Sequence, residues 1–310
     1  MNRDLLLRAA KPVWTVAVFV TAGWFLRTRA DVIWDRLAEL SVARIIAALL
    51  LLILAKIVLV DIVRRSIAAV GYQWGSRHVA YMTMTSQLAK YLPGGIWHLV
   101  ERAGMYNRHG MSLGTGSRAI LLEQTWLLVS AGCFGGALAW AGLGASLFLP
   151  EWLPERLTPF IGLAVLAPIW VVATFTSLRL AGGTLPRWPA LTTNLAEQAG
   201  VWTLMGLSFW ALLPQGNTIA TAMTAVGAFA LAWAAGYVAV FAPGGIGVRE
   251  AALVVTLSPL LPSEQTAAAA LVSRVIWTGA ELFLGAFAHL ALRGPTRGGQ
   301  PNSALRSRRR

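Results

Sequence analysis

The tetrapeptide Pro-Gly-Gly-Ile occurs twice in this chain, at residues 93–96 and 243–246, an offset of 150 residues. Proline and paired glycines disfavour a continuous helix, so each copy predicts a break after which a new helix begins. The first turn of a helix carries free N–H groups and the positive end of the helix dipole, which attract anions. Each break therefore predicts a place where an anionic group can approach the backbone.

An acidic and a basic residue follow each break, Glu101 with Arg102 and Arg249 with Glu250. A guanidinium fork matches two oxygens of a phosphate, and glycine lets a ligand come close to the backbone. A simpler interpretation stays open, in which Pro-Gly-Gly closes a tight turn and the neighbouring charges pair with each other. The first interpretation predicts a lipid headgroup site formed by Pro93, Gly94, Gly95, Glu101, Arg102, Pro243, Gly244, Gly245, Gly247, Arg249 and Glu250.

Four further polar residues interrupt long apolar stretches: Glu123, Gln124, Arg274 and Glu281. Such groups are costly in lipid and face a bundle interior or a water-filled cavity. Arg274 and Glu281 are seven residues apart, two helical turns, so they share one helix face. We expect the four to line or gate a transport path, with a structural ion pair as the alternative; Lys56 and Asp61 are weaker candidates for the same role.

The composition indicates a membrane protein, because 56% of the 310 residues are hydrophobic and only 13% are charged. Soluble domains carry about 25% charged residues. The net charge is +13, and the segment 293–310 is rich in arginine. Nucleic-acid binding would explain such a tail, but the positive-inside bias explains it more simply, as a basic, disordered cytoplasmic tail.

The apolar segments also repeat at the offset of the tetrapeptide. We therefore expect two units of about 150 residues, residues 1–145 and 146–292. The matching pairs of segments are 13–28 with 163–178, 45–63 with 195–213, 68–92 with 218–242, and 117–142 with 267–292.

The distribution of arginine and lysine favours an odd number of spans in each unit, with both termini in the cytoplasm. Two consecutive units that each have an odd number of spans insert in opposite orientations, as in many transporters. The predicted fold is an all-α polytopic membrane protein: an inverted repeat of about six full spans plus two re-entrant or broken Pro-Gly-Gly elements, about eight hydrophobic segments. One alternative stays open, because residues 218–242 are long enough to span alone.

The sequence gives no sign of a metal, a cofactor or a catalytic set. His98, Glu101 and His109 do not have the spacing of a zinc-binding helix. Cys133 is the single cysteine, so no intrachain disulfide forms. The fourteen tryptophans are expected to form mainly an aromatic belt near helix ends.

The stretches YLPGGIWHLVERAG, SLGTGSRAILLEQTWLL and APGGIGVREAALVVTL resemble the transmembrane region of lysylphosphatidylglycerol synthases and their stand-alone flippase-like relatives. The resemblance covers roughly Ile45 to Leu292, and it is weaker at Gln124, where relatives often have arginine. It implies lipid handling in a bacterial-type inner membrane. The soluble aminoacyltransferase domain of the bifunctional relatives is not present in these 310 residues, so we expect no lysyl transfer and no enzyme.

The leading hypothesis is a flippase-like transporter that moves an anionic phospholipid or glycolipid headgroup between leaflets. Its partner would be a membrane lipid, with no cofactor and no nucleic acid. The alternative is a non-transporting membrane subunit that scaffolds an envelope glycosyltransferase or a lipid-modifying enzyme. An integral-membrane enzyme is a third possibility, and it would need a catalytic constellation beyond the Glu and Arg pairs.

Overall fold

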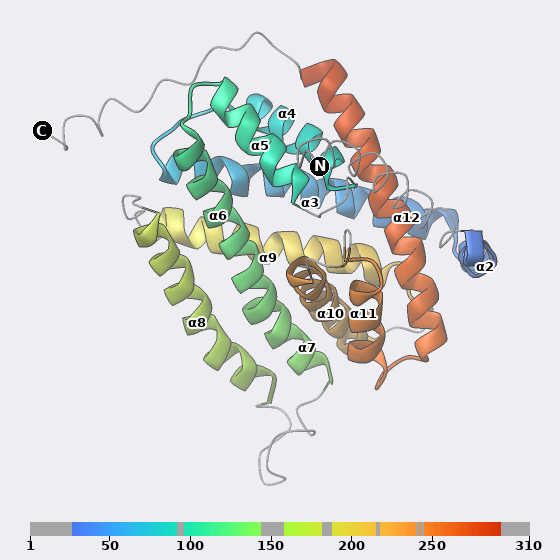
Figure 1. Cartoon of the computed structure of the whole chain (residues 1–310). Helices are drawn as coiled ribbons and strands as arrows, with labels where there is room; N and C mark the ends of the chain where they lie inside the picture. The colour runs from blue at the N-terminus through green and yellow to red at the C-terminus, as the bar shows by residue number, and fades with distance from the viewer. Residues whose placement is uncertain are drawn as a thin grey trace, which may run out of the picture.

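A computed structural model describes residues 27–91, 96–143, 158–181, 188–214, 218–239, 242 and 245–292, and over these residues it is all-helical (Figure 1). The first half contains α2 (Ala30–Glu39), α3 (Val42–Ala69), α4 (Ser76–Gln87), the 3₁₀ turn η1 (Leu88–Tyr91), α5 (Trp97–Arg108), α6 (Leu113–Ser130), the π turn η2 (Ala131–Gly135) and α7 (Gly136–Leu143). The second half contains α8 (Thr158–Leu180), α9 (Trp188–Trp210), α10 (Ile219–Val238), α11 (Val248–Leu257), α12 (Ser263–Phe287) and the π turn η6 (Ala288–Leu292).

Five helical stretches in the described part of the chain are long and apolar enough to cross a membrane. The prediction of an all-α fold is therefore confirmed over these residues, and the five stretches are compatible with a multi-pass membrane protein. The second member of the pair 45–63 and 195–213 is helical, as α9, but is not among the five. The five stretches are Val42–Ala69, Leu113–Leu143, Phe160–Leu180, Ile219–Val238 and Ser263–Leu292.

Two features of the element order recur at the offset of the tetrapeptide. A short helix comes after each Pro-Gly-Gly-Ile, α5 in the first half and α11 in the second. The long helices that follow begin at Leu113 and Ser263, which lie at the predicted offset of 150 residues. Residues 13–26 of the predicted segment 13–28, the unit boundary near 145 and the tail 293–310 lie outside the described residues.

The expected single helix over residues 68–92 is wrong. Helix α3 continues to Ala69, and α4 begins only at Ser76. Between them Gly71 has a φ of 96°, a conformation that favours glycine and ends the helix. The second copy, by contrast, forms the continuous helix α10. The two halves therefore share an order of elements but differ in this helix.

Helix α10 packs closely against the stretch from η2 to α7. A Cβ on Gly135 would lie 2.6 Å from Ala230, and one on Gly142 would lie 2.2 Å from Thr224. Small residues let membrane helices approach to backbone distance, where van der Waals packing holds them together. The glycines on these helices thus fix α10 in the middle of the bundle, where it forms one wall of the cavity described below.

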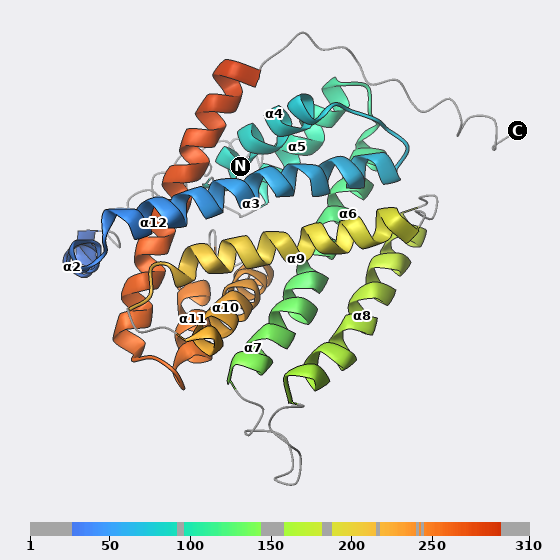
Figure 2. The same cartoon turned by 180° about the vertical axis from the view of Figure 1, so that it is seen from behind.

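Helices α3 and α9 lie side by side, as both views show (Figure 2). They run in opposite directions, because opposite ends of the two helices meet. Near the start of α3, Arg44 Nε donates to the carbonyl of Ala211 at 2.9 Å, just beyond the end of α9. Nearer the other end, Arg65 Nε lies 2.6 Å from Glu197 Oε2. These contacts tie the first half of the chain to the second.

Candidate functional site

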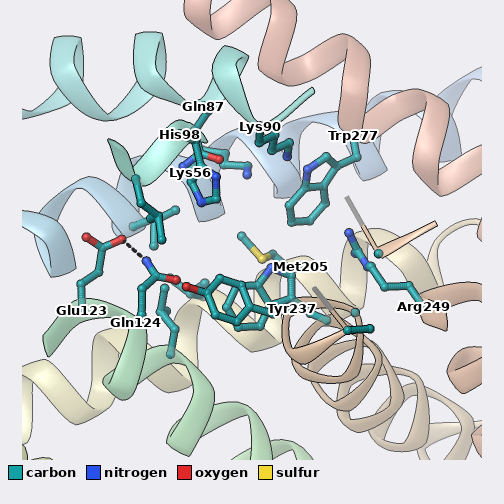
Figure 3. A pocket seen from close by; sticks show the side chains of 18 of the residues that line it. Lys56, Gln87, Lys90, His98, Glu123, Gln124, Met205, Tyr237, Arg249 and Trp277 are labelled. Carbon is teal, nitrogen blue, oxygen red and sulfur yellow. Dashed lines mark hydrogen bonds between the residues drawn. The ribbon is translucent and has the colours of Figure 1, made fainter. Parts of the chain in front are cut away.

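A cavity of about 190 Å³ lies within the helix bundle and is lined by residues from both halves (Figure 3). The first half contributes side chains from α3, α4, η1, α5 and α6, and the second half from α9, α10, α11 and α12. One residue of each Pro-Gly-Gly-Ile copy, Ile96 and Gly245, borders it. The described parts of the two tetrapeptides therefore border the same cavity.

The side of the cavity formed by α3, η1, α11 and α12 is cationic. Lys56, Lys90, Arg249 and Arg274 line it together with Trp277. The Trp277 ring lies between cations: Lys56 Nζ is 4.0 Å and Arg249 Cζ 5.0 Å from its centroid. Cation–π attraction holds such groups over an aromatic face while they remain charged. This wall presents positive charge to any group that enters.

Glu281 lies behind the cationic wall with only 2% of its side chain exposed. Its Oε1 accepts from Lys56 Nζ at 2.7 Å and from Trp277 Nε1 at 2.7 Å. Its other oxygen, Oε2, pairs with Lys90. One buried carboxylate therefore holds cations from α3 and η1 against α12. The structure places Glu281 as the counter-ion of two cavity lysines, whereas the sequence suggested a group on the path.

Arg249 reaches the cavity because Gly236 leaves room for its side chain. A Cβ on Gly236 would lie 2.4 Å from Arg249 Cγ and 3.3 Å from the Cα of Gly245. Gly245 itself has a φ of 69° and approaches the backbone of Gly236. The glycine of the second tetrapeptide thus serves the close approach of two backbones, and the arginine passes beside them. Of the predicted headgroup residues, Gly245 and Arg249 line the cavity.

Arg102 does not line the cavity, although it was expected to bind a headgroup. It is 1% exposed, and its Nη1 donates to both oxygens of Glu123 at 2.9 and 2.7 Å. Glu123 also accepts from Gln124 Nε2 at 3.0 Å. Burying an unpaired guanidinium costs free energy, and the ion pair with Glu123 offsets that cost. Glu123 and Gln124, expected on the path, do border the cavity, opposite Arg249 (Figure 3).

Glu250 is engaged by the protein itself. Its Oε2 accepts from the backbone N–H of Gly247 at 2.7 Å, and its Oε1 lies 3.3 Å from Arg274 Nε. Gly247 has a φ of 85° and precedes the first residue of α11. The start of this helix was expected to receive a headgroup anion. The carboxylate of Glu250 already occupies that position, as in a capping interaction.

The remaining predicted residues lie away from the cavity or cannot be placed. Glu101 has a side chain that is 47% exposed and pairs with Arg108 at 2.8 Å, so it faces outward. Asp61 pairs with Arg64 and does not line the cavity, whereas the other weak candidate, Lys56, does. Five residues lie outside the described part of the chain: Pro93, Gly94, Gly95, Pro243 and Gly244.

Sequence reasoning missed several residues of the cavity. Lys90 was not singled out, although it stands three residues before the first tetrapeptide, and a lysine beside a predicted membrane break was an available signal. Trp277 was grouped with the tryptophans of an aromatic belt. The cavity wall formed by Trp202, Trp233 and Tyr237 had no signal in the sequence, because their positions depend on how α9 and α10 pack.

The cavity has an excess of positive charge over the described residues. Five basic side chains lie on it or pair directly behind it, against three carboxylates that each already serve as a counter-ion. The basic residues are Lys56, Lys90, Arg102, Arg249 and Arg274, and the acids are Glu123, Glu250 and Glu281. An enclosed space of this charge favours an anionic ligand.

Comparison with known proteins adds no family to these observations, because no protein-family model matches the chain and no curated protein matches it.

Proposed function

We propose that this protein is a flippase-like lipid transporter, which moves an anionic phospholipid or glycolipid headgroup between the two leaflets. The observation that carries the proposal is the cationic cavity bordered by both Pro-Gly-Gly-Ile copies. A lipid headgroup that crosses a bilayer needs a polar, enclosed place within the protein, since a charge in hydrocarbon is costly. The cavity offers that place, with Lys56, Lys90, Arg249 and Arg274 as phosphate ligands.

An inverted repeat would give the two leaflets equivalent access to such a site. The antiparallel packing of α3 and α9, which occupy matching positions in the two units, supports this symmetry. The short helices α5 and α11 would then be the two broken elements that enter from opposite sides. On this proposal the protein lies in a bacterial-type inner membrane with both termini in the cytoplasm.

The resemblance to the transmembrane region of lysylphosphatidylglycerol synthases leads to the same class of function. The most specific stretch of that resemblance, APGGIGVREA, contains Gly245 and Arg249, which line the cavity. We therefore propose lipid transport for this chain, as the resemblance implies, and propose no aminoacyl transfer. The scaffolding alternative differs in a measurable way, because a scaffold moves no lipid by itself.

Removing the Arg249 guanidinium should slow transport. In proteoliposomes with fluorescent phosphatidylglycerol, we expect Arg249→Gln to lower the translocation rate about tenfold or more, because a charged hydrogen bond contributes about 1.5–3 kcal/mol. Arg108→Gln is the matched control, since Arg108 is an exposed arginine that pairs with Glu101. Equal rates for the wild type and Arg249→Gln would remove the role of Arg249. Rates equal to empty liposomes for the wild type would favour the scaffold.

The affinity for an anionic lipid should fall as the pH rises. Lys90 lies outside the five candidate spans, and burial lowers its pKa to about 7, helped by Lys56 and Arg249 and opposed by Glu281. Lys90 is therefore charged below about pH 7 and loses its charge above it. We expect binding of phosphatidylglycerol, whose phosphodiester keeps a single charge over this range, to weaken between pH 6 and about pH 8 when measured by native mass spectrometry of the purified protein.

Lys90→Arg is the control for this pH dependence, because arginine stays charged over the whole range. The variant should keep its affinity at pH 8. His98 also lines the cavity, so His98→Asn is tested in parallel. If Lys90→Arg loses affinity with pH as the wild type does, Lys90 is not the responsible group.

A further inference from the structure

We infer that the lipid carries a phosphate bonded to an uncharged, hydroxylated group, such as a polyol or a sugar ring, and that the cavity rejects headgroups bearing an ammonium. This inference rests on the proposed function and specifies its substrate class. Three features of the cavity carry it: the carboxylates are already engaged, the space exceeds that of a phosphate, and the side facing the cations carries aromatic rings, where the carboxylate of Glu123 is paired with Arg102.

The acidic side chains near the cavity are all occupied by groups of the protein. Glu123 accepts from Arg102 and Gln124, and Glu281 holds two lysines and the Trp277 N–H. Glu250, behind the wall, accepts from a backbone N–H and pairs with Arg274. An aminoacylated or choline headgroup would bring a further cation into a space already in positive excess. Over the described residues no carboxylate remains to receive it, so such a headgroup is disfavoured.

The cavity is larger than a phosphate requires. Its volume is about 190 Å³. One buried water needs about 10–15 Å³ of such space, so the cavity has room for roughly a dozen waters or more. A phosphate bound to Lys90 and Arg249 would displace only part of that water. The remaining space lies between the cationic wall and the residues of α6, α9 and α10. A headgroup that fills the cavity therefore extends beyond its phosphate.

The opposite wall suits a neutral ring with hydroxyl groups. Trp233 stacks on Tyr237 with ring centroids 5.1 Å apart, and Trp202 lies 5.0 Å from Trp233. Aromatic rings offer an apolar surface against which the C–H face of a ring can pack. Beside them the Tyr237 hydroxyl and the Gln124 amide offer donors and acceptors without charge, and the Gln87 amide lies across the cavity near Lys56 and Lys90 (Figure 3). Hydroxyl groups need partners of both kinds.

An aromatic wall could also hold a quaternary ammonium, as aromatic cages do. Two observations favour the neutral ring. The ring that lies next to the cationic groups, Trp277, is already occupied by Lys56 and Arg249. On the other wall Trp233 and Tyr237 stack with only 21° between them, so these two rings do not converge on a point as the rings of a cage do, and Trp202 is tilted by 56° to Trp233. Tight binding of a cationic lipid in the test below would therefore contradict the inference.

The test compares lipids with identical acyl chains on the purified, full-length protein by native mass spectrometry. The probes are phosphatidic acid, phosphatidylinositol, phosphatidylcholine and lysyl-phosphatidylglycerol. We expect phosphatidylinositol to bind at least about fivefold more tightly than phosphatidic acid, because added hydrogen bonds outweigh the greater charge of the bare phosphate. Both cationic headgroups should bind at least about tenfold more weakly than phosphatidylinositol.

Two conservative variants locate the effect. Gln87→Met and Tyr237→Phe keep the size of the side chain and remove its hydrogen-bonding group. Each variant should bind phosphatidylinositol more weakly and bind phosphatidic acid as tightly as the wild type does. Unchanged binding of phosphatidic acid also shows that the variant is folded. Tighter binding of phosphatidic acid, or of either cationic lipid, would overturn the inference and leave the phosphate site in place. Binding of none of these lipids would overturn the proposed function as well.

Discussion

Replacing Glu281 by glutamine will lower the free energy of unfolding by about 3–5 kcal/mol, the cost of breaking a buried ion pair by removal of one partner. The carboxylate is 2% exposed and is the shared counter-ion of Lys56 and Lys90. Glutamine keeps the shape and can still accept from the Trp277 N–H, but it carries no charge. Both ammonium groups then lie close together beside Trp277 without their anion, and the contacts from α3 and η1 to α12 weaken.

The free energy of unfolding is measured by titration from mild detergent into denaturing detergent, followed by helical circular dichroism. Glu101→Gln is the matched control, because Glu101 forms an exposed pair with Arg108 and exposed pairs contribute about 1 kcal/mol or less. Comparable losses in the two variants would contradict the assigned role of Glu281. A double variant, Glu281→Gln with Lys90→Gln, should recover part of the stability by removing one of the two uncompensated charges.

Adding a single methyl group at Gly236 will disable transport without removing any polar group. The new Cβ would lie 2.4 Å from Arg249 Cγ and close to Gly245, so the arginine must leave its place beside Trp277. We expect Gly236→Ala to lower the rate of lipid translocation about tenfold or more, the loss of a charged contact to the phosphate. The measurement is the proteoliposome assay with fluorescent phosphatidylglycerol.

Gly279→Ala is the control for this substitution, because a Cβ there meets no atom within 4 Å. Gly279 lies in α12, two residues from Trp277, and alanine is the better helix former by about 1 kcal/mol. This variant should transport at the wild-type rate and be slightly more stable. A wild-type rate in Gly236→Ala, with the protein still folded, would show that the position of Arg249 does not control transport.

The helical segments and their breaks were predictable because they depend on neighbours in the sequence. Apolar stretches of membrane length predicted the candidate spans, and Pro-Gly-Gly-Ile predicted the breaks before α5 and α11. The prediction of one helix over residues 68–92 failed at a signal that is also local in the sequence. Gly71 was a visible signal for an end of helix, but the apolar pattern and the match with the second unit suggested continuity.

The candidate site was predictable only in part. Gly245, Arg249, Glu123, Gln124 and Arg274 were chosen from the sequence and line the cavity. Arg102 looked equivalent to Arg249, since both follow a break beside a glutamate. Nothing in the local sequence says that one turns toward Glu123 on α6 and is buried, while the other passes two glycines and reaches the cavity.

By itself, the sequence determined that this chain is helical, apolar enough for a membrane and interrupted twice by the same tetrapeptide, because hydropathy and helix-breaking act over a few residues. Only the tertiary structure decided which charges meet. Lys56, Lys90 and Glu281 come from three elements far apart in the chain, and they pair because a buried charge must find a counter-ion wherever the packing brings one. The same packing of α9, α10 and α11 sets which basic groups remain on the cavity and therefore what it can bind.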